Sequence, residues 1–139
     1  MRVLAFAVVL IAASLAWAAD AAYWPKGAEV YIISPRDGAT VKNPVTVRFG
    51  LKGMGIAPAG VKFENTGHHH LLIDTAVPAD LTQPLPVTDN VRHFGKGQTE
   101  ATLTLPAGTH TLQLVLGDEN HVPHSPPLVS KKITIHVTE

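Results

Sequence analysis

The chain has 139 residues, and its 11 Lys and Arg balance its 11 Asp and Glu, so its formal net charge is zero at neutral pH. This balance argues against a nucleic-acid-binding protein, and a hydrophobic fraction of 45% argues against a disordered chain. The chain has no cysteine, which excludes disulfides, zinc–thiolate fingers, iron–sulfur clusters, cysteine nucleophiles and the thiolate-bound blue-copper centre, whereas eight histidines are its one compositional excess.

The N-terminal segment 1–19 has the pattern of a secretory signal peptide. A short positive start precedes an almost unbroken apolar run over 3–15, and Ala16 and Ala18 supply the small residues that a signal peptidase reads. A transmembrane anchor is the weaker interpretation, because the run is short for a bilayer and no basic stop follows it. We therefore expect a Sec-type bacterial export signal cleaved after Ala18 or Ala19, and a periplasmic or secreted protein without stable membrane insertion.

The remaining residues, 20–139, predict a single all-β domain, an immunoglobulin-like antiparallel β-sandwich of about seven strands. Strands are expected, between Gly, Pro and Asn turn signals, at 29–34, 45–51, 61–64, 68–74, 99–105, 109–116 and 129–138. The Pro-rich residues 75–98 are expected to form a long loop that crosses between the sheets, and residues 19–28 a loose N-terminal arm. No stretch of ten or more residues has a clean helical period.

Three consecutive histidines lie in the expected strand 68–74. Alternate residues of a strand share a face, so His69 would lie on the core face with Leu71, while His68 and His70 would project side by side, roughly 6–7 Å apart. Two imidazoles at that spacing on a rigid strand can begin a copper or zinc site. The alternative interpretation is a solvated polar face beside a buried, hydrogen-bonded His69.

A second histidine cluster follows in a later Pro-rich loop. His121 and His124 are three residues apart, and Asp118 can ligate a metal or orient an imidazole from outside the ligand set. Together with His68 and His70, the two loop histidines would complete a set of four ligands. The alternative interpretation is a plain turn with two exposed histidines.

Three further residues are lesser ligand candidates. His110 follows a Gly-Thr turn at a corner where many sandwiches carry a tyrosine, and this structural role ranks above ligation. His93 lies in the long loop and is a candidate for lining a pocket. Met54 lies between two glycines, where its thioether would suit Cu(I), although a loop methionine that fills a gap in the core is the favoured interpretation.

Enzymatic chemistries have weaker support in the sequence. Asp74, His124 and Ser125 resemble a triad only in composition, because no nucleophile elbow or oxyanion loop accompanies them. A metal-dependent enzyme would need an open coordination position and a general base, and the sequence does not place Glu64 or Glu119 beside the histidines. We therefore do not predict an enzyme.

Four segments of the chain have distinctive patterns: 49–60, 67–74 (GHHHLLID), 93–99 (HFGKGQT), and 108–112 (GTHTL) running into 121–124 (HVPH). In these segments the chain resembles a bacterial family of exported proteins, the domain of unknown function 4399. Together these segments extend over nearly all of the chain that follows the expected signal peptide. The resemblance implies secretion and a one-domain β fold, and it implies no activity.

The sequence thus predicts a periplasmic metal-binding protein for copper storage, delivery or protection, with His68, His70, His121 and His124 as its ligands. Copper ranks above zinc because imidazole-rich sites favour Cu(II) in the affinity order, and because the one thioether would suit Cu(I). Another periplasmic protein is the expected partner besides the metal. The alternative is a metal-free immunoglobulin-like module that binds a partner protein or a component of the cell envelope.

Overall fold

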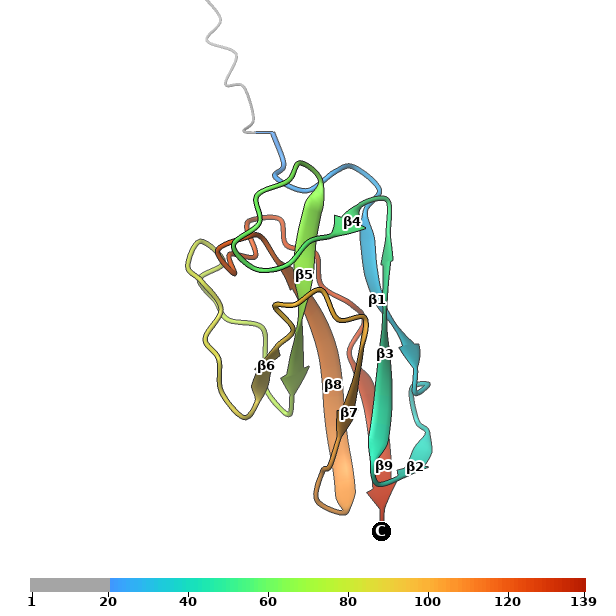
Figure 1. Cartoon of the computed structure of the whole chain (residues 1–139). Helices are drawn as coiled ribbons and strands as arrows, with labels where there is room; N and C mark the ends of the chain where they lie inside the picture. The colour runs from blue at the N-terminus through green and yellow to red at the C-terminus, as the bar shows by residue number, and fades with distance from the viewer. Residues whose placement is uncertain (1–20) are drawn as a thin grey trace, which may run out of the picture.

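The computed structural model describes residues 21–139, which form two packed β-sheets (Figure 1). The expected signal peptide lies outside the described residues. The strands of the described part are β1 (Glu29–Ser34), β2 (Thr40–Lys42), β3 (Val45–Lys52), β4 (Gly55–Ile56), β5 (Thr66–Ile73), β6 (Val91–His93), β7 (Glu100–Leu103), β8 (Gly108–Gly117) and β9 (Ile133–Thr138). Within residues 21–139 the chain forms no helix, and thus none of the length and apolar character needed to cross a membrane.

The smaller sheet has the order β1-β3-β7, and the larger has the order β2-β9-β8-β5-β4, with β6 also paired to β5. All pairings are antiparallel except β2 with β9 and β4 with β5. The expectation of an all-β, two-sheet sandwich is therefore confirmed. Strands β4 and β6 both pair with the same edge of β5, one at each end, so β5 is enclosed along most of its length.

One expected strand is wrong, and three short strands were not expected. Residues 61–64 are irregular and end in a turn at Asn65, whose φ is +56°; the side chains of Val61 and Phe63 point into solvent, where no sheet would bury them. Strands β2, β4 and β6 have only two or three residues each and lie in segments expected to be turns or loops. Strand β6 matters most, because it divides the expected loop 75–98.

The core lies between the two sheets. Val47 and Phe49 alternate inward along β3, as expected, and they pack against Leu112 and Leu114 of β8 and Ile135 of β9. Alternating apolar residues on facing strands remove one face of each sheet from water, which is the main stabilising contribution to such a fold.

Strand β5 departs from this alternation, since its residues from Gly67 to Ile73 are all buried. Leu72, on the face away from the core, packs with Leu85 of the long connection and Val115 of β8 in a second apolar cluster. Figure 1 shows the connection between β5 and β6 on the outer side of β5. The face that carries His68 and His70 is therefore covered, and not solvated as the alternative interpretation of the sequence had it.

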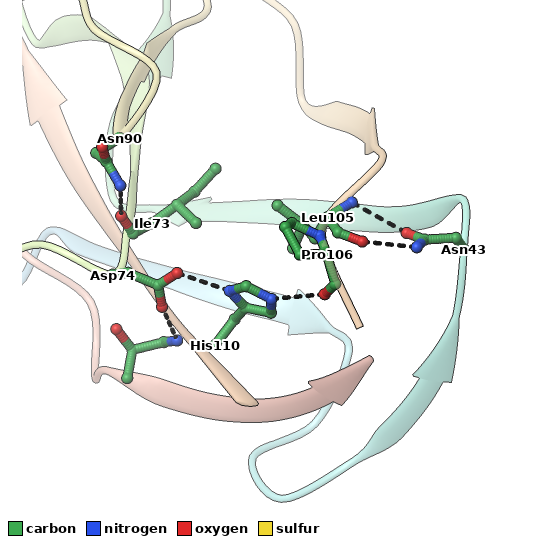
Figure 2. A network of polar contacts seen from close by, with 8 residues as sticks. Asn43, Ile73, Asp74, Asn90, Leu105, Pro106 and His110 are labelled. Carbon is green, nitrogen blue, oxygen red and sulfur yellow. Dashed lines mark hydrogen bonds and ion pairs between the residues drawn. The ribbon is translucent and has the colours of Figure 1, made fainter. Parts of the chain in front are cut away.

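A polar network around His110 fastens one corner of the sandwich (Figure 2). The His110 Nδ1 lies 2.6 Å from Asp74 Oδ2, its Nε2 lies 2.8 Å from the Pro106 carbonyl oxygen, and the Thr111 N–H donates to Asp74 Oδ1. Both partners of the imidazole are acceptors, so both ring nitrogens donate and the ring is protonated. The hydrogen bond to Asp74 raises the pKa of His110.

Replacing His110 by glutamine is expected to destabilise the protein by about 1 kcal/mol at pH 6, and by less at pH 9. Because the folded-state pKa of His110 is raised above its unfolded value of about 6.5, its contribution is fully present below that value. The contribution is lost as the pH rises through the folded-state pKa. Denaturant unfolding at both pH values measures the difference, with His136→Gln, at an exposed position, as the control. Equal losses at both pH values would contradict a protonated corner.

Candidate metal centre

Four histidines from three parts of the chain converge outside the core, on the covered face of β5. His68 and His70 belong to β5, His93 ends β6, and His121 lies in the loop after β8. One ring nitrogen from each lies within 4.8 Å of the corresponding nitrogens of the other three. The six distances between ring centroids span only 4.5 to 5.7 Å.

The strand pairings explain why these residues meet. Alternation along β5 places His68 and His70 on one face, as the sequence predicted. Strand β6 pairs with β5 so that His93 lies opposite His70, and β8 pairs so that Gly117 lies opposite His68. The chain leaves β8 at Gly117 and turns at once into the loop that carries His121.

The strand histidines are fully buried, and three of their four ring nitrogens lack hydrogen-bond partners. His68 and His70 have 0% of their surface exposed, and within the cluster the single hydrogen bond joins His68 Nε2 to His121 Nδ1 at 3.0 Å. In the described part of the chain, every buried side-chain nitrogen or oxygen without a hydrogen-bond partner belongs to a histidine: His68 Nδ1, both nitrogens of His69, both nitrogens of His70, and His93 Nε2. Each such atom costs about 1–3 kcal/mol when it stays unpaired, so the pocket is suited to a ligand that accepts lone pairs.

The two strand histidines are uncharged at pH 7. Burial lowers the pKa of His68 to about 4 and that of His70 to about 3, and the neighbouring imidazoles of His93 and His121 lower both further. Burial also lowers the pKa of His93. Neutral imidazoles keep their lone pairs available, and metal binding therefore does not have to displace protons from cationic rings.

His69 lies on the opposite face of β5 and does not join the cluster. Its side chain is buried towards the core, where its ring centroid is 5.1 Å from that of Phe49. Burial alone lowers the pKa of His69 to about 4. The expected face is confirmed, but His69 has no hydrogen-bond partner.

Asp118 organises the loop that carries His121. Its Oδ1 accepts the backbone N–H groups of Asn120 and Val122 at 2.8 and 2.9 Å, and its Oδ2 lies 2.7 Å from His124 Nε2. The backbone adopts positive φ angles at His121 (+67°) and His124 (+61°), which non-glycine residues rarely adopt. Such conformations persist where the surroundings over-determine them, and they concentrate at functional sites.

The structure does not bring His124 to the cluster, and His93 lies there instead. The ring of His124 is held by the Asp118 carboxylate on one side and stacks on the Tyr23 ring on the other, with centroids 3.5 Å apart and planes 7° apart. Asp118 forms no hydrogen bond with a ring of the cluster, so it does not orient a clustered imidazole as expected, and the imidazole that it holds is that of His124. His121 therefore joins His68 and His70 as expected, whereas His124 does not.

The N-terminal arm is packed onto this loop, which corrects the expectation for residues 21–28. Trp24 is only 5% exposed, and its indole N–H donates to the Pro123 carbonyl oxygen at 2.7 Å. From the other side, the Leu85 N–H donates to the carbonyl oxygen of His121 at 2.9 Å. The loop that carries His121 is thus held by the N-terminal arm and by the long connection together.

The other ligand candidates lie elsewhere. His110 belongs to the corner network described above. Met54 is half-buried in the turn between β3 and β4, just before Gly55, which pairs with Thr66 at the start of β5. One signal for His93 was present in the sequence: the glycine two residues after it leaves space for its ring.

Gly95→Ala is expected to lower metal affinity about tenfold or more while hardly changing the stability of the metal-free fold. A Cβ at Gly95 would lie 2.2 Å from His93 Cε1 and 2.4 Å from His93 Nε2, so the ring must move, whereas the backbone of Gly95 does not require a positive φ. Competition titration of Cu or Zn against a chelator measures the affinity. The matched control is Gly55→Ala, whose Cβ makes an ordinary 3.4 Å contact with Thr66. Equal affinities for the two variants would show that the position of His93 does not matter.

The sequence model of the family described as "Domain of unknown function (DUF4399)" matches residues 47–138. The matched span contains all four clustered histidines and Asp118. No curated protein and no solved structure matches the chain.

Proposed function

We propose that this chain, which belongs to the DUF4399 family, is an exported protein that binds one transition-metal ion through His68, His70, His93 and His121. The family description names no activity, so the proposal rests on the pocket itself. The observation that carries it is the convergence of four imidazoles, three of which, His68, His70 and His93, have buried ring nitrogens without a hydrogen-bond partner. A bound ion would satisfy one nitrogen of each ring at once.

The donor set favours copper or zinc. Neutral imidazoles suit late first-row transition metals, whereas Mg²⁺ and Ca²⁺ prefer oxygen ligands, and no carboxylate belongs to the clustered group in the described residues. Copper is our first choice because it stands highest in the affinity order for nitrogen sites, and zinc is the second.

Holding an ion fits this pocket better than catalysis does. Four protein ligands close a coordination sphere, whereas catalytic metal sites keep a position for water or substrate. His68 and His70 are fully buried, while His93 and His121 are half-buried at the rim, so the ion would enter and leave past the rim pair. We therefore propose storage, delivery or protection in the bacterial periplasm.

Calorimetric titration of Cu(II), Zn(II) and, without oxygen, Cu(I) into the untagged exported protein tests this function. We expect tight one-to-one binding that is lost in the variant His68→Ala/His70→Ala and retained in His136→Ala, which removes an exposed histidine outside the pocket. Weak binding at several sites, indifferent to the double substitution, would overturn the proposal. The histidines would then have only a structural role. The alternative function, a metal-free module that binds a partner, would replace the proposed metal binding.

Export has its own test. Cell fractionation should place the protein in the periplasm, and N-terminal sequencing of that material should begin at Ala19 or Asp20. A full-length protein recovered from the cytoplasm would contradict the proposed location without bearing on the metal pocket.

A further inference from the structure

The spacing of the four rings distinguishes two coordination geometries. With metal–nitrogen distances of about 2.0–2.1 Å, a tetrahedral set of imidazoles has all six ring centroids about 5.2 Å apart. A square-planar set at the same distances has four neighbouring pairs at about 4.5 Å and two opposite pairs at about 6.4 Å. The observed separations run from 4.5 Å (His93 and His121) to 5.7 Å (His70 and His121), and no pair reaches the opposite-pair value. The spacing of the ring centroids is therefore that of a tetrahedral set rather than a square-planar one.

The chain resists a change to a planar set. His68 and His70 are two residues apart on one strand, and His93 is fixed beside His70 by the pairing of β6 with β5. The loop of His121 is fixed by Asp118 and by the N-terminal arm. Flattening the set would require the ring of His121 or of His93 to leave a position that several contacts determine.

The charge of the ion stays largely uncompensated in this pocket. All four ligands are neutral, and Asp118 is the carboxylate whose charge acts on His68. Its oxygens already bind His124 and two backbone N–H groups. Because the energy of burying a charge grows with its square, a divalent ion is penalised about four times as strongly as a monovalent ion here.

From this geometry and this charge balance we infer that the pocket selects Cu(I) over both Cu(II) and Zn(II). Cu(I) has a filled d shell and accepts a tetrahedral set, whereas Cu(II) prefers tetragonal or square-planar ligands. Zn(II) accepts the tetrahedral set but carries the second charge. The inference rests on the proposed function, whose ion it specifies. A protein with this preference would hold copper as Cu(I). It would oppose oxidation to Cu(II), because its ligands cannot adopt the tetragonal or square-planar arrangement that Cu(II) prefers.

The test compares three affinities of the untagged exported protein. Cu(I) is titrated without oxygen against the chelator bicinchoninate, Cu(II) against glycine, and Zn(II) against a zinc indicator dye. We expect Cu(I) to bind at least about 100-fold more tightly than Cu(II), which corresponds to a reduction potential about 120 mV above that of aqueous copper. Zn(II) should bind more weakly than Cu(I), and Cu(II) forced into the site should give a distorted rather than tetragonal EPR spectrum.

The outcomes separate this inference from the proposed function. Tighter binding of Cu(II) with a tetragonal spectrum, or displacement of Cu(I) by equimolar Zn(II), would overturn the inference and leave a metal-binding protein. Failure of every ion to bind in a manner that depends on His68 and His70 would overturn the proposed function. His93→Ala, at the half-buried rim, should weaken Cu(I) and reduce the preference over Cu(II), while His136→Ala should change neither. An unchanged preference in His93→Ala would exclude the four-histidine set.

Discussion

Replacing His70 by leucine is expected to abolish metal binding and to leave the metal-free protein at least as stable as the wild type. Both ring nitrogens of His70 are buried without a hydrogen-bond partner, and leucine has a similar volume. Removing unpaired buried polar atoms relieves a cost of about 1–3 kcal/mol each, part of which is returned by imperfect packing of the new side chain. Denaturant unfolding of the metal-free proteins, beside a metal titration, measures both effects.

Leu72→Ala provides the control for packing in this experiment. Leu72 lies on the same face of β5 and contacts Leu85 and Val115, so its truncation should cost about 2–5 kcal/mol by leaving a cavity. If His70→Leu destabilised the metal-free protein by a similar amount, the imidazole would be a structural element of the fold, and the case for a ligand pocket would weaken.

The metal-free protein is expected to lose stability steeply as the pH falls from 6.5 to 4. Burial lowers the pKa of His68 and of His69 to about 4, and that of His70 to about 3, whereas each is about 6.5 in the unfolded chain. The unfolded state therefore binds up to three more protons over this interval. Each proton contributes about 1.4 kcal/mol per pH unit, so together they remove about 4 kcal/mol per unit. Over these 2.5 pH units the loss amounts to at most about 10 kcal/mol, which is enough to unfold a domain in the lower part of the ordinary range of about 5–15 kcal/mol.

Unfolding free energies measured by circular dichroism between pH 7.5 and 4 check the slope. The variant His70→Leu should show about two-thirds of the wild-type slope, because two of the three buried histidines remain. Bound metal should move the transition to lower pH, since protons must then displace the ion. A wild-type stability that is flat between pH 6.5 and 4 would contradict neutral, buried histidines.

Local patterns in the sequence predicted the two ligands of the metal centre that lie in strand β5. Alternation along a strand is a property of a few neighbouring residues, and it correctly placed His68 and His70 on one face and His69 on the other. The burial of the outer face could not be read from the same pattern, because residues such as Leu85 that cover it lie in a long, Pro-rich connection. For the same reason, the sequence left open whether the histidine face meets solvent.

The other two ligands, His93 and His121, reach the metal centre through contacts between residues that are distant in the sequence. His93 reaches the cluster because a three-residue strand pairs with β5, and a strand so short has no periodicity to recognise. His124 points away because its positive φ and the Asp118 carboxylate turn it towards Tyr23. Neither the register of a short strand nor a left-handed backbone at a histidine follows from local residue preferences.

The hydrogen bond between Trp24 and Pro123 has a consequence for the order of events during biosynthesis. It joins residues 99 positions apart, and the ligands it supports extend from His68 to His121. Contacts of such long range form late in folding, because the chain must lose the entropy of closing a large loop before the contact can stabilise it. A growing chain therefore has no assembled pocket until synthesis has passed His121 and Pro123. Chains that lack these residues cannot sequester the ion at this site, and loading requires that the loop has folded against the N-terminal arm.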